Sequence, residues 1–448
     1  MKHFLLILLM SVPATADARQ ELTPRERDMV SFIDSRFEDA VAYLERVVNI
    51  NSGSMNFEGV RAVGAVFDAT FTELGFDTWW VDGAPFGRAG HLFARRVGAG
   101  SGADSGAGAG QSGAGPHILM VGHLDTVFED DSPFQRFERV DENTAVGPGV
   151  IDMKGGDVVI VEVIRALAQA GALDDVTITV ALIGDEESSG DPLELGRAAL
   201  VEAAREADIA LAFEPGDGKS ETAVTARRGF TGWEVTTHGL RAHSSRVFSE
   251  DVGYGAIYEA ARILVGFYET MAGEELLTFN PGLIVGGTDI TFDDQEEEGT
   301  AFGKTNVIAG KSLISGDLRA LSLEQRDAAK ERMRRVVVEH LPGTDAEITF
   351  RDSYPPMGPT EGNRELLERL SRVSETAGYG AVAAANPAEA GAADISFTGA
   401  HVTAALDGLG ILGSGTHTTH ETADLRTMPM QITRTALLLL RMAEDWNR

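Results

Sequence analysis

The amino-acid sequence predicts an α/β fold: a mixed, mostly parallel sheet flanked by helices, with a smaller α+β sandwich domain inserted into it. Three observations support this prediction. Apolar strand-like runs alternate with amphipathic helical segments between residues 117 and 213, this pattern changes after about Arg228, and it returns towards the C-terminus. The length of 448 residues also favours two domains, because single hydrophobic cores stop growing at about 250–300 residues.

The first α/β part contains three apolar runs that are typical of strands buried on both faces of a sheet. These runs are His117–Val121, Val176–Ile183 and Ile209–Phe213. Between them the sequence predicts helices near Gly156–Ala170 and over Pro192–Arg205. This alternation indicates a largely parallel sheet with helices on its faces.

The inserted domain is predicted at residues 229–338, between two parts of the larger domain at 19–228 and 339–448. Its expected elements are a strand at Phe230–Thr237, a helix at Val252–Glu269, strands at Leu283–Val285, Asn306–Ala309 and Ser312–Arg319, and a helix at Leu323–Leu341. Two strand–helix groups of this kind are typical of a small α+β sandwich. The α/β pattern then returns with a helix at Glu365–Ala377, a turn at Gly391–Phe397 and a final helix at Pro429–Asp445.

Residues 1–18 are predicted to be a secretory signal peptide. A short polar start is followed by the apolar core Phe4–Val12 and by small residues that allow cleavage after Ala16 or Ala18. The apolar core is too short to span a membrane as a mature helix, so we expect a secreted or periplasmic protein without a membrane span. A retained anchor is the alternative. The sequence contains no cysteine, so its stability must come from core packing without disulfides.

Three further features of the sequence bear on its partners, its loops and its chemistry. The net charge of −31 argues against a nucleic-acid partner, because phosphate would be repelled. The Gly/Ala/Ser tract at residues 98–115 is expected to form a solvated loop between two strands. No G-x-S-x-G segment occurs, which argues against a serine hydrolase.

Ionisable residues follow the predicted strands at the points where the strands end. His123 and Asp125 follow the first strand, and in an extended segment their side chains lie on the same side, so Asp125 can orient His123 as a metal ligand. Glu186 and Glu187 follow the next strand, and their side chains point to different sides, so one can bind metal while the other faces a substrate. The alternative for these two acids is a solvated turn.

Three more segments carry candidate ligands. Asp152 lies in the Gly-rich run GPGVIDMKGG, where its alternative role is a helix N-cap. Glu214 follows the strand Ile209–Phe213, and His417 lies in GTHTTHE. Without cysteine, only His, Asp and Glu remain as strong metal ligands. The residues alone therefore predict a metal-dependent hydrolase.

The ordered motifs resemble one known family. GHLDTV, GPGVIDMKGG, GDEE, FEPGDG, RRGF, AHSS, the Gly391–Asp394 turn and GTHTTHE occur in the order found in the zinc exopeptidase and deacylase family. That family includes glutamate carboxypeptidase, aminoacylase, acetylornithine deacetylase and succinyl-diaminopimelate desuccinylase. The resemblance covers nearly all of the chain after residue 30, and the run DTVFEDDSPF is most similar to glutamate carboxypeptidase.

The resemblance implies a dinuclear zinc site, with Co²⁺ or Mn²⁺ as alternative metals. His123 and Glu214 would hold one ion, Glu187 and His417 the other, and Asp152 would bridge both. His420 is the alternative to His417, which we prefer because the family has a glutamate four residues after its ligand, where Glu421 stands here.

The resemblance also implies the catalytic groups. Asp125 would orient His123, Glu186 would be the general base, and the Asp152–Met153 peptide bond would be cis. His243 of the inserted domain would stabilise the oxyanion, often from the partner subunit of a homodimer formed through that lid domain.

Substrate contacts are implied for three further residues, Arg228, Asn306 and Arg319. The expected reaction is cleavage of an amide bond next to a free amino-acid carboxylate by a metal-bound hydroxide, as in carboxypeptidases of the glutamate carboxypeptidase type. Substrates would be peptides or N-acyl amino acids. One departure is that the segment Tyr354–Pro356 contains no arginine, where the glutamate carboxypeptidase type has one nearby. Alternatives are an N-acyl-amino-acid deacylase, a non-catalytic periplasmic binding protein on the same fold, and an interaction module acting through the lid domain.

Overall fold

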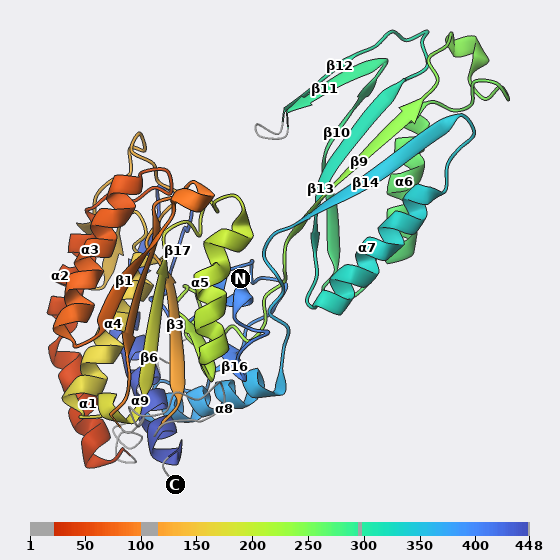
Figure 1. The fold of residues 1–448 in the computed structure, drawn as a ribbon. Helices are drawn as coiled ribbons and strands as arrows, with labels where there is room; N and C mark the ends of the chain where they lie inside the picture. The colour runs from red at the N-terminus through yellow and green to blue at the C-terminus, as the bar shows by residue number, and fades with distance from the viewer. Residues whose placement is uncertain (1–21, 100–114, 294–297, 447–448) are drawn as a thin grey trace, which may run out of the picture. The chain divides into compact units, whose positions relative to one another are not determined.

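The computed structural model describes residues 22–99, 115–293 and 298–446. These residues form two compact units (Figure 1). The first unit runs to Thr225 and also includes Pro359–Ala385 and the chain from Thr398 onward, and the second comprises Ala226–Gly358 and Asn386–Phe397. The predicted signal peptide at 1–18 and most of the Gly/Ala/Ser tract lie outside the described residues. Within the described ranges, no helix is both long and apolar enough to cross a membrane.

The first unit is built on a six-stranded mixed sheet of order β1-β2-β6-β3-β7-β16. Its strands are β1 (Asp77–Asp82), β2 (Gly90–Arg96), β6 (Thr177–Ile183), β3 (His117–His123), β7 (Ile209–Ala212) and β16 (Ala404–Leu406). β2 is antiparallel to both of its neighbours, whereas β6, β3, β7 and β16 are parallel. The predicted mixed, mostly parallel sheet is therefore confirmed.

Helices cover this sheet, and most of them contribute to one large apolar core (Figure 1). They are α1 (Pro24–Ser35), α2 (Phe37–Val48), α3 (Phe57–Glu73), α4 (Lys154–Gln169), α5 (Leu193–Glu206), α8 (Glu361–Thr376) and α9 (Thr427–Trp446). The predicted helices α4, α5, α8 and α9 and the three predicted strands are present, with ends shifted by a few residues. α4 packs against β3 on one side and against α1, α2 and α9 on the other, which explains why it is apolar around most of its circumference.

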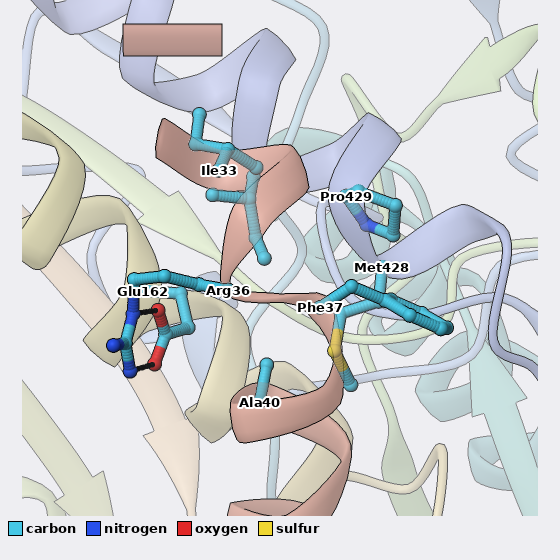
Figure 2. A pocket seen from close by; sticks show the side chains of 8 residues that line it. Ile33, Arg36, Phe37, Ala40, Glu162, Met428 and Pro429 are labelled. Carbon is cyan, nitrogen blue, oxygen red and sulfur yellow. Dashed lines mark hydrogen bonds and ion pairs between the residues drawn. The ribbon is translucent and has the colours of Figure 1, made fainter. Parts of the chain in front are cut away.

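A small pocket lies where α1 and α2 meet α4 and α9 (Figure 2). The Arg36 guanidinium forms two hydrogen bonds with the Glu162 carboxylate there, Nε to Oε2 at 2.7 Å and Nη2 to Oε1 at 3.2 Å. The pocket volume of about 10 Å³ is near the minimum needed for one water molecule. The ion pair joins the junction of α1 and α2 to α4, and the pocket is too small to bind a substrate.

A second, four-stranded antiparallel sheet in the first unit brings distant loops together. Its order is β17-β18-β5-β4, with β17 at Gly413–Ser414, β18 at Thr422–Asp424, β5 at Thr144–Val146 and β4 at Glu138–Arg139. β18 pairs with β5, so the segment after His417 runs beside the chain that leads to Asp152. A two-stranded parallel pair, β8 (Thr222–Ala223) with β15 (Ala383–Ala384), and the short 3-10 helices η2 (Ala84–Phe86) and η3 (Leu173–Asp175) complete this unit.

The second unit is an antiparallel sheet of order β10-β13-β9-β14 that packs against two helices (Figure 1). The strands are β10 (Thr278–Gly287), β13 (Lys311–Arg319), β9 (Thr231–Gly239) and β14 (Thr344–Asp352), and the helices are α6 (Ala256–Met271) and α7 (Leu323–Val338). Trp233, Phe267 and Met333 belong to its separate core. A hairpin of β11 (Asp289–Asp293) and β12 (Glu298–Phe302) and the 3-10 helices η4 (Ser244–Arg246) and η5 (Asp394–Phe397) complete the unit.

This unit differs from the predicted inserted domain in three respects. It includes Asn386–Phe397, which the prediction placed in the larger domain. It continues past residue 338 to Gly358, because β14 pairs with β9 along its whole length. The predicted strand at Asn306–Ala309 does not form. The segment makes only an isolated bridge between Val307 and His243, so Asn306 lies in a loop.

Candidate metal centre

The candidate site lies at the carboxyl ends of three neighbouring strands of the six-stranded sheet. His123 is the last residue of β3, Glu186 and Glu187 follow β6, and Glu214 follows β7. Because β6, β3 and β7 are adjacent and parallel, their carboxyl ends meet at one edge of the sheet. The sequence pattern of acids and an imidazole after apolar runs therefore becomes one cluster.

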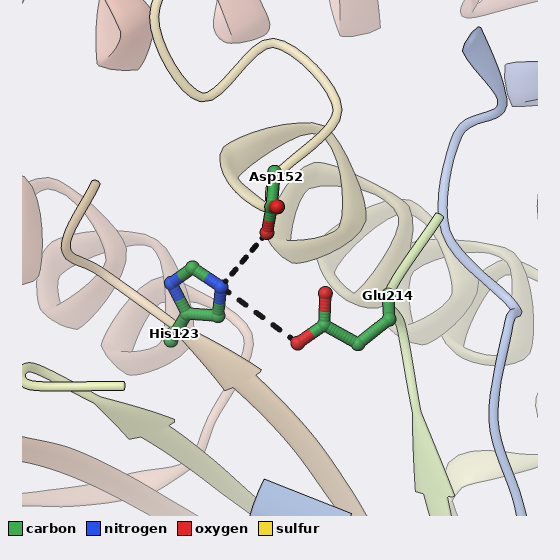
Figure 3. Close-up of side chains that lie close together, drawn as sticks. All are labelled: His123, Asp152 and Glu214. Atoms are coloured by element: carbon green, nitrogen blue, oxygen red, sulfur yellow. Dashed lines mark hydrogen bonds and ion pairs between the residues drawn. The ribbon is translucent and has the colours of Figure 1, made fainter. Parts of the chain in front are cut away.

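Two groups of potential metal ligands share the Asp152 side chain. In the first, His123 Nε2 lies 3.2 Å from Asp152 Oδ1 and 3.7 Å from Glu214 Oε1 (Figure 3). In the second, His417 Nε2 lies 3.3 Å from Asp152 Oδ2 and 3.0 Å from Glu187 Oε2. In each group one donor atom from each residue lies within 4.8 Å of the others. The two oxygens of Asp152 thus face the two groups separately.

The electrostatics of this cluster favour bound cations. Burial raises the pKa of Glu187 and raises that of Glu214 well above its usual range. Burial also opposes ionisation of Asp152, but His123 and His417 outweigh it and lower the pKa of Asp152. Hydrogen bonds with Asp152 and Glu187 raise the pKa of His417 to about 10. Three crowded carboxylates next to two imidazoles are expensive to bury unless positive charge balances them.

The donor set fits a pair of divalent transition-metal ions. Each group offers one imidazole nitrogen and two carboxylate oxygens, which are ligands that suit Zn²⁺ and also Co²⁺ or Mn²⁺. Three protein ligands for each ion leave room for water or substrate, as in catalytic rather than structural sites. His420, the alternative to His417, is exposed and lies in neither group.

Asp125 contacts the ligand His123 without belonging to either ligand group. Its side chain is fully buried, and Oδ1 lies 3.4 Å from His123 Nδ1, the ring nitrogen that faces away from Asp152. The same ring nitrogen forms a hydrogen bond with the backbone carbonyl of Asp125 at 3.0 Å. The same carboxylate accepts hydrogen bonds from Ser54 Oγ at 2.6 Å and from the backbone N–H groups of Glu186 at 3.0 Å and Glu187 at 3.1 Å. Asp125 therefore holds the loops after β3 and β6 together as well as orienting His123.

Glu186 is half-buried and belongs to neither ligand group. Its negative charge contributes to the raised pKa of Glu214, which places its carboxylate near the cluster. The next residue, Glu187, differs from Glu186 because its carboxylate lies 3.0 Å from His417 Nε2 and belongs to a ligand group. Glu187 therefore lies among the candidate ligands, whereas the role of Glu186 in proton transfer stays a prediction.

The loop that carries Asp152 is held by a residue that the sequence did not assign. The fully buried Glu421 carboxylate accepts three backbone N–H groups, from Gly149 at 3.1 Å, Ile151 at 2.8 Å and Asp152 at 3.0 Å. The peptide bond between Asp152 and Met153 is cis, as predicted. Directly after it, the buried Lys154 ammonium donates to the Ile50 carbonyl at 2.8 Å.

Two other supporting residues were also missed. Asp407, which follows β16, accepts the backbone N–H of Glu214 at 3.3 Å and is fully buried. The sequence could have indicated Asp407, because it follows an apolar strand just as Glu186 and Glu214 do. Ser54 carries no comparable signal, because its contact with Asp125 joins residues 71 positions apart.

The predicted substrate residues form two separate pairs in the second unit. His243 and Asn306 are neighbours, since Ser244 N–H donates to the Asn306 carbonyl at 2.9 Å and Val307 bridges His243. Arg228 and Arg319 are also neighbours. Burial lowers the pKa of Arg228, and the positive charge of Arg319 lowers it further. The guanidinium of Arg319 lies 5.2 Å from the ring centre of Phe230, and its Nε donates to Asp317 at 2.8 Å.

These two pairs lie at opposite ends of β13. Arg319 is the last residue of β13. The pair of His243 and Asn306 lies beyond the other end of the strand, where Ile308, three residues before Lys311, donates its N–H to the Ala242 carbonyl. The eight steps from residue 311 to 319, at about 3.3 Å each, separate the ends by roughly 26 Å.

Comparisons with known proteins agree with this geometry. Residues 119–441 match Peptidase family M20/M25/M40. Carboxypeptidase G2 of Pseudomonas sp. (strain RS-16) is 24% identical over 434 residues, covering 96% of each chain. Among solved structures, the aminopeptidase PepT of Bacillus cereus ATCC 10987 aligns with a TM-score of 0.70 and 20% identity, over 91% of this chain and 99% of that chain. The YXEP protein of Bacillus subtilis is described as a dinuclear metal binding peptidase from the M20 family. It aligns with a TM-score of 0.60 and 15% identity, over 92% of this chain and 99% of that chain. This chain is therefore a metallohydrolase that belongs to Peptidase family M20/M25/M40.

Proposed function

We propose that this protein is a dinuclear zinc-dependent carboxypeptidase that cleaves an amide bond next to a free amino-acid carboxylate. The observation that carries the proposal is the pair of ligand groups sharing Asp152, with Glu186 beside them and outside both groups. The similarity to carboxypeptidase G2 over almost the whole chain supports the carboxypeptidase assignment.

His123, Asp152 and Glu214 would hold one ion, and Asp152, Glu187 and His417 the other. When bound, these ions would supply the Lewis acidity that lowers the pKa of a water molecule and polarises an amide carbonyl. Glu186 would accept the proton of the attacking water and then donate it to the leaving nitrogen. Asp125 would keep His123 in one ring orientation throughout.

The second unit offers groups for the substrate. Arg228 and Arg319 present two neighbouring guanidinium groups, which suit a substrate carboxylate. His243 Nδ1 accepts the Ser245 N–H at 3.2 Å, so Nε2 is the nitrogen that carries a proton and would donate it to an oxyanion. Asn306, next to His243, would contact the same part of the substrate.

The separation of roughly 26 Å between these pairs supports a homodimer. A single amide substrate is much shorter than β13, so we infer that His243 and Arg319 of one chain contact different substrate molecules. A second copy would supply His243 and Asn306. Exposed apolar side chains on α6 and on the edge strand β10 offer a surface for that copy: Ile257, Tyr258, Val265, Tyr268 and Ile284.

The N-terminal sequence supports secretion or export to the periplasm. Its short polar start, apolar core and small-residue cleavage site are typical of a signal peptide. An exported enzyme of this kind would act on peptides or N-acyl amino acids outside the cytoplasm.

The proposal is tested with the Glu186→Gln variant of the mature protein. We expect about two zinc ions per chain in both the variant and the wild type, and a loss of turnover of about 10²–10⁴-fold in the variant. Glu194→Gln, an exposed acid in the first turn of α5, is the matched control and should keep full activity. An active Glu186→Gln enzyme, or a wild-type protein that binds no metal, would contradict the proposal.

A substrate panel separates the carboxypeptidase from an N-acyl-amino-acid deacylase. Dipeptides, acyl-glutamate amides and simple N-acetyl amino acids should be compared with the same compounds as methyl esters. Preference for a C-terminal residue with a free carboxylate, whatever the length of the acyl part, supports the carboxypeptidase. Preference for short acyl groups would favour the deacylase.

A further inference from the structure

Glu421 is a fully buried acid with an unusual set of partners. Its carboxylate accepts three backbone N–H groups from one short loop, those of Gly149, Ile151 and Asp152, at 2.8–3.1 Å. It belongs to neither ligand group, so it would not be a ligand of either ion. A buried carboxylate with three backbone partners instead determines the shape of the loop that it binds.

The backbone of Glu421 belongs to the turn that carries His417. Its N–H donates to the Thr418 carbonyl at 3.1 Å, and the Thr418 N–H donates to Gly415 at 3.1 Å. His417 itself has a positive φ of 61°, so its position depends on this turn. The next residues form β18, which pairs with β5 and fixes the turn beside the chain that leads to Asp152.

Glu421 therefore connects two of the three ligands in the second group. Its backbone is part of the turn with His417, and its side chain holds the loop with Asp152. The first group depends on it less, because His123 and Glu214 lie at the ends of β3 and β7 and make no hydrogen bond with it. Burial lowers the pKa of the Lys154 ammonium, at the start of α4, to about 7, and the nearby Glu421 opposes this shift.

We propose that Glu421 is a positioning residue that sets the distance between Asp152 and His417 and thereby determines the affinity of the second ion. This inference rests on the proposed dinuclear site. In Glu421→Gln one carboxylate oxygen becomes an NH₂ group, which cannot accept the N–H facing it, so the Asp152 loop loses at least one of its three hydrogen bonds. The ligands of the second ion then move apart, while two ligands of the first ion stay in place.

The test measures metal affinity directly, by titrating metal-free protein with Zn²⁺ against a chelator and with Co²⁺ by visible absorption. We expect Glu421→Gln to bind the first ion like the wild type and the second about 10–100-fold more weakly. Glu421→Asp keeps the charge opposite Lys154 and should bind the second ion with intermediate affinity. It also serves as the test if Glu421→Gln does not fold.

Glu259→Gln is the matched control. Glu259 is also fully buried and accepts the Leu341 N–H at 2.9 Å and the Thr344 hydroxyl at 3.0 Å, but it lies in the second unit. Its loss should lower stability without changing either metal affinity. Two ions bound by Glu421→Gln at wild-type affinity, or an equal loss at both sites, would overturn the inference. Failure of the wild type to bind two ions would instead contradict the proposed function.

Discussion

Replacing Asp125 by asparagine tests how far the metal site depends on one buried carboxylate. Asp125 accepts hydrogen bonds from Ser54 Oγ, from Glu186 N–H and from Glu187 N–H, and it lies against His123. Asparagine has almost the same shape, but one of its two terminal groups is an NH₂ that cannot accept a hydrogen bond. At least one of these donors must therefore lose its partner in a fully buried place.

The size of the effect follows from these contacts. A hydrogen bond to a charged group contributes about 1.5–3 kcal/mol, so losing one or two removes roughly 2–6 kcal/mol, divided between folding and metal binding. Loss of a group that orients a ligating histidine typically weakens metal binding about 10–100-fold. The Asp125 backbone carbonyl still contacts His123 Nδ1 in the variant, so we expect an effect near the lower end of this range. Both ions should be affected, because Asp125 contacts His123 of the first group and the backbone of Glu187 in the second.

The assay combines chelator competition for Zn²⁺ with thermal unfolding of the metal-free protein. Ser54→Ala is the matched control, since it removes one of the hydrogen bonds and leaves the charge and both backbone contacts in place. It should have a smaller effect than Asp125→Asn in both measurements. The reasoning is refuted if Asp125→Asn binds both ions and unfolds like the wild type, or if Ser54→Ala has the larger effect.

Three further predictions concern other parts of the molecule. Arg319→Ala should raise KM for substrates with a free carboxylate and leave KM for their methyl esters unchanged, and equal effects on both would exclude contact with the carboxylate. Tyr268→Glu places a charge on an exposed apolar face of α6, where the side chain is 68% exposed, and should produce a monomer by light scattering with normal metal content and low activity. A fully active monomer would contradict a site completed by a second copy. Burial lowers the pKa of His117 from its ordinary value of 6.5, so below pH 6.5 the unfolded chain takes up a proton that the folded protein does not, and stability falls as the solution becomes more acidic. In denaturant unfolding between pH 7 and 5, His117→Gln should lose stability less steeply than the wild type, by at most about 1.4 kcal/mol per pH unit, and identical slopes would refute this assignment.

The strands and helices around the site could be predicted from the sequence because each has a strong local pattern. β3 and β6 are continuous apolar runs, and α4, α8 and α9 have helical periodicity with clear ends. The strand β14 was not predicted, since its pairing with β9 rather than its own composition makes it part of the inserted sheet. Asn306–Ala309 was wrongly predicted as a strand because it has a strand-like composition but only one bridging partner.

By itself, the sequence predicted which side chains are available to bind a metal. His123, Glu187 and Glu214 stand where apolar runs end, and the absence of cysteine leaves only such residues to bind a metal. Only the tertiary structure decided how they are held. Ser54 contacts Asp125 across 71 positions, and Glu421 contacts Gly149 across 272. Contacts over such distances leave no periodicity in the sequence, because they depend on which strands become neighbours in the folded sheet.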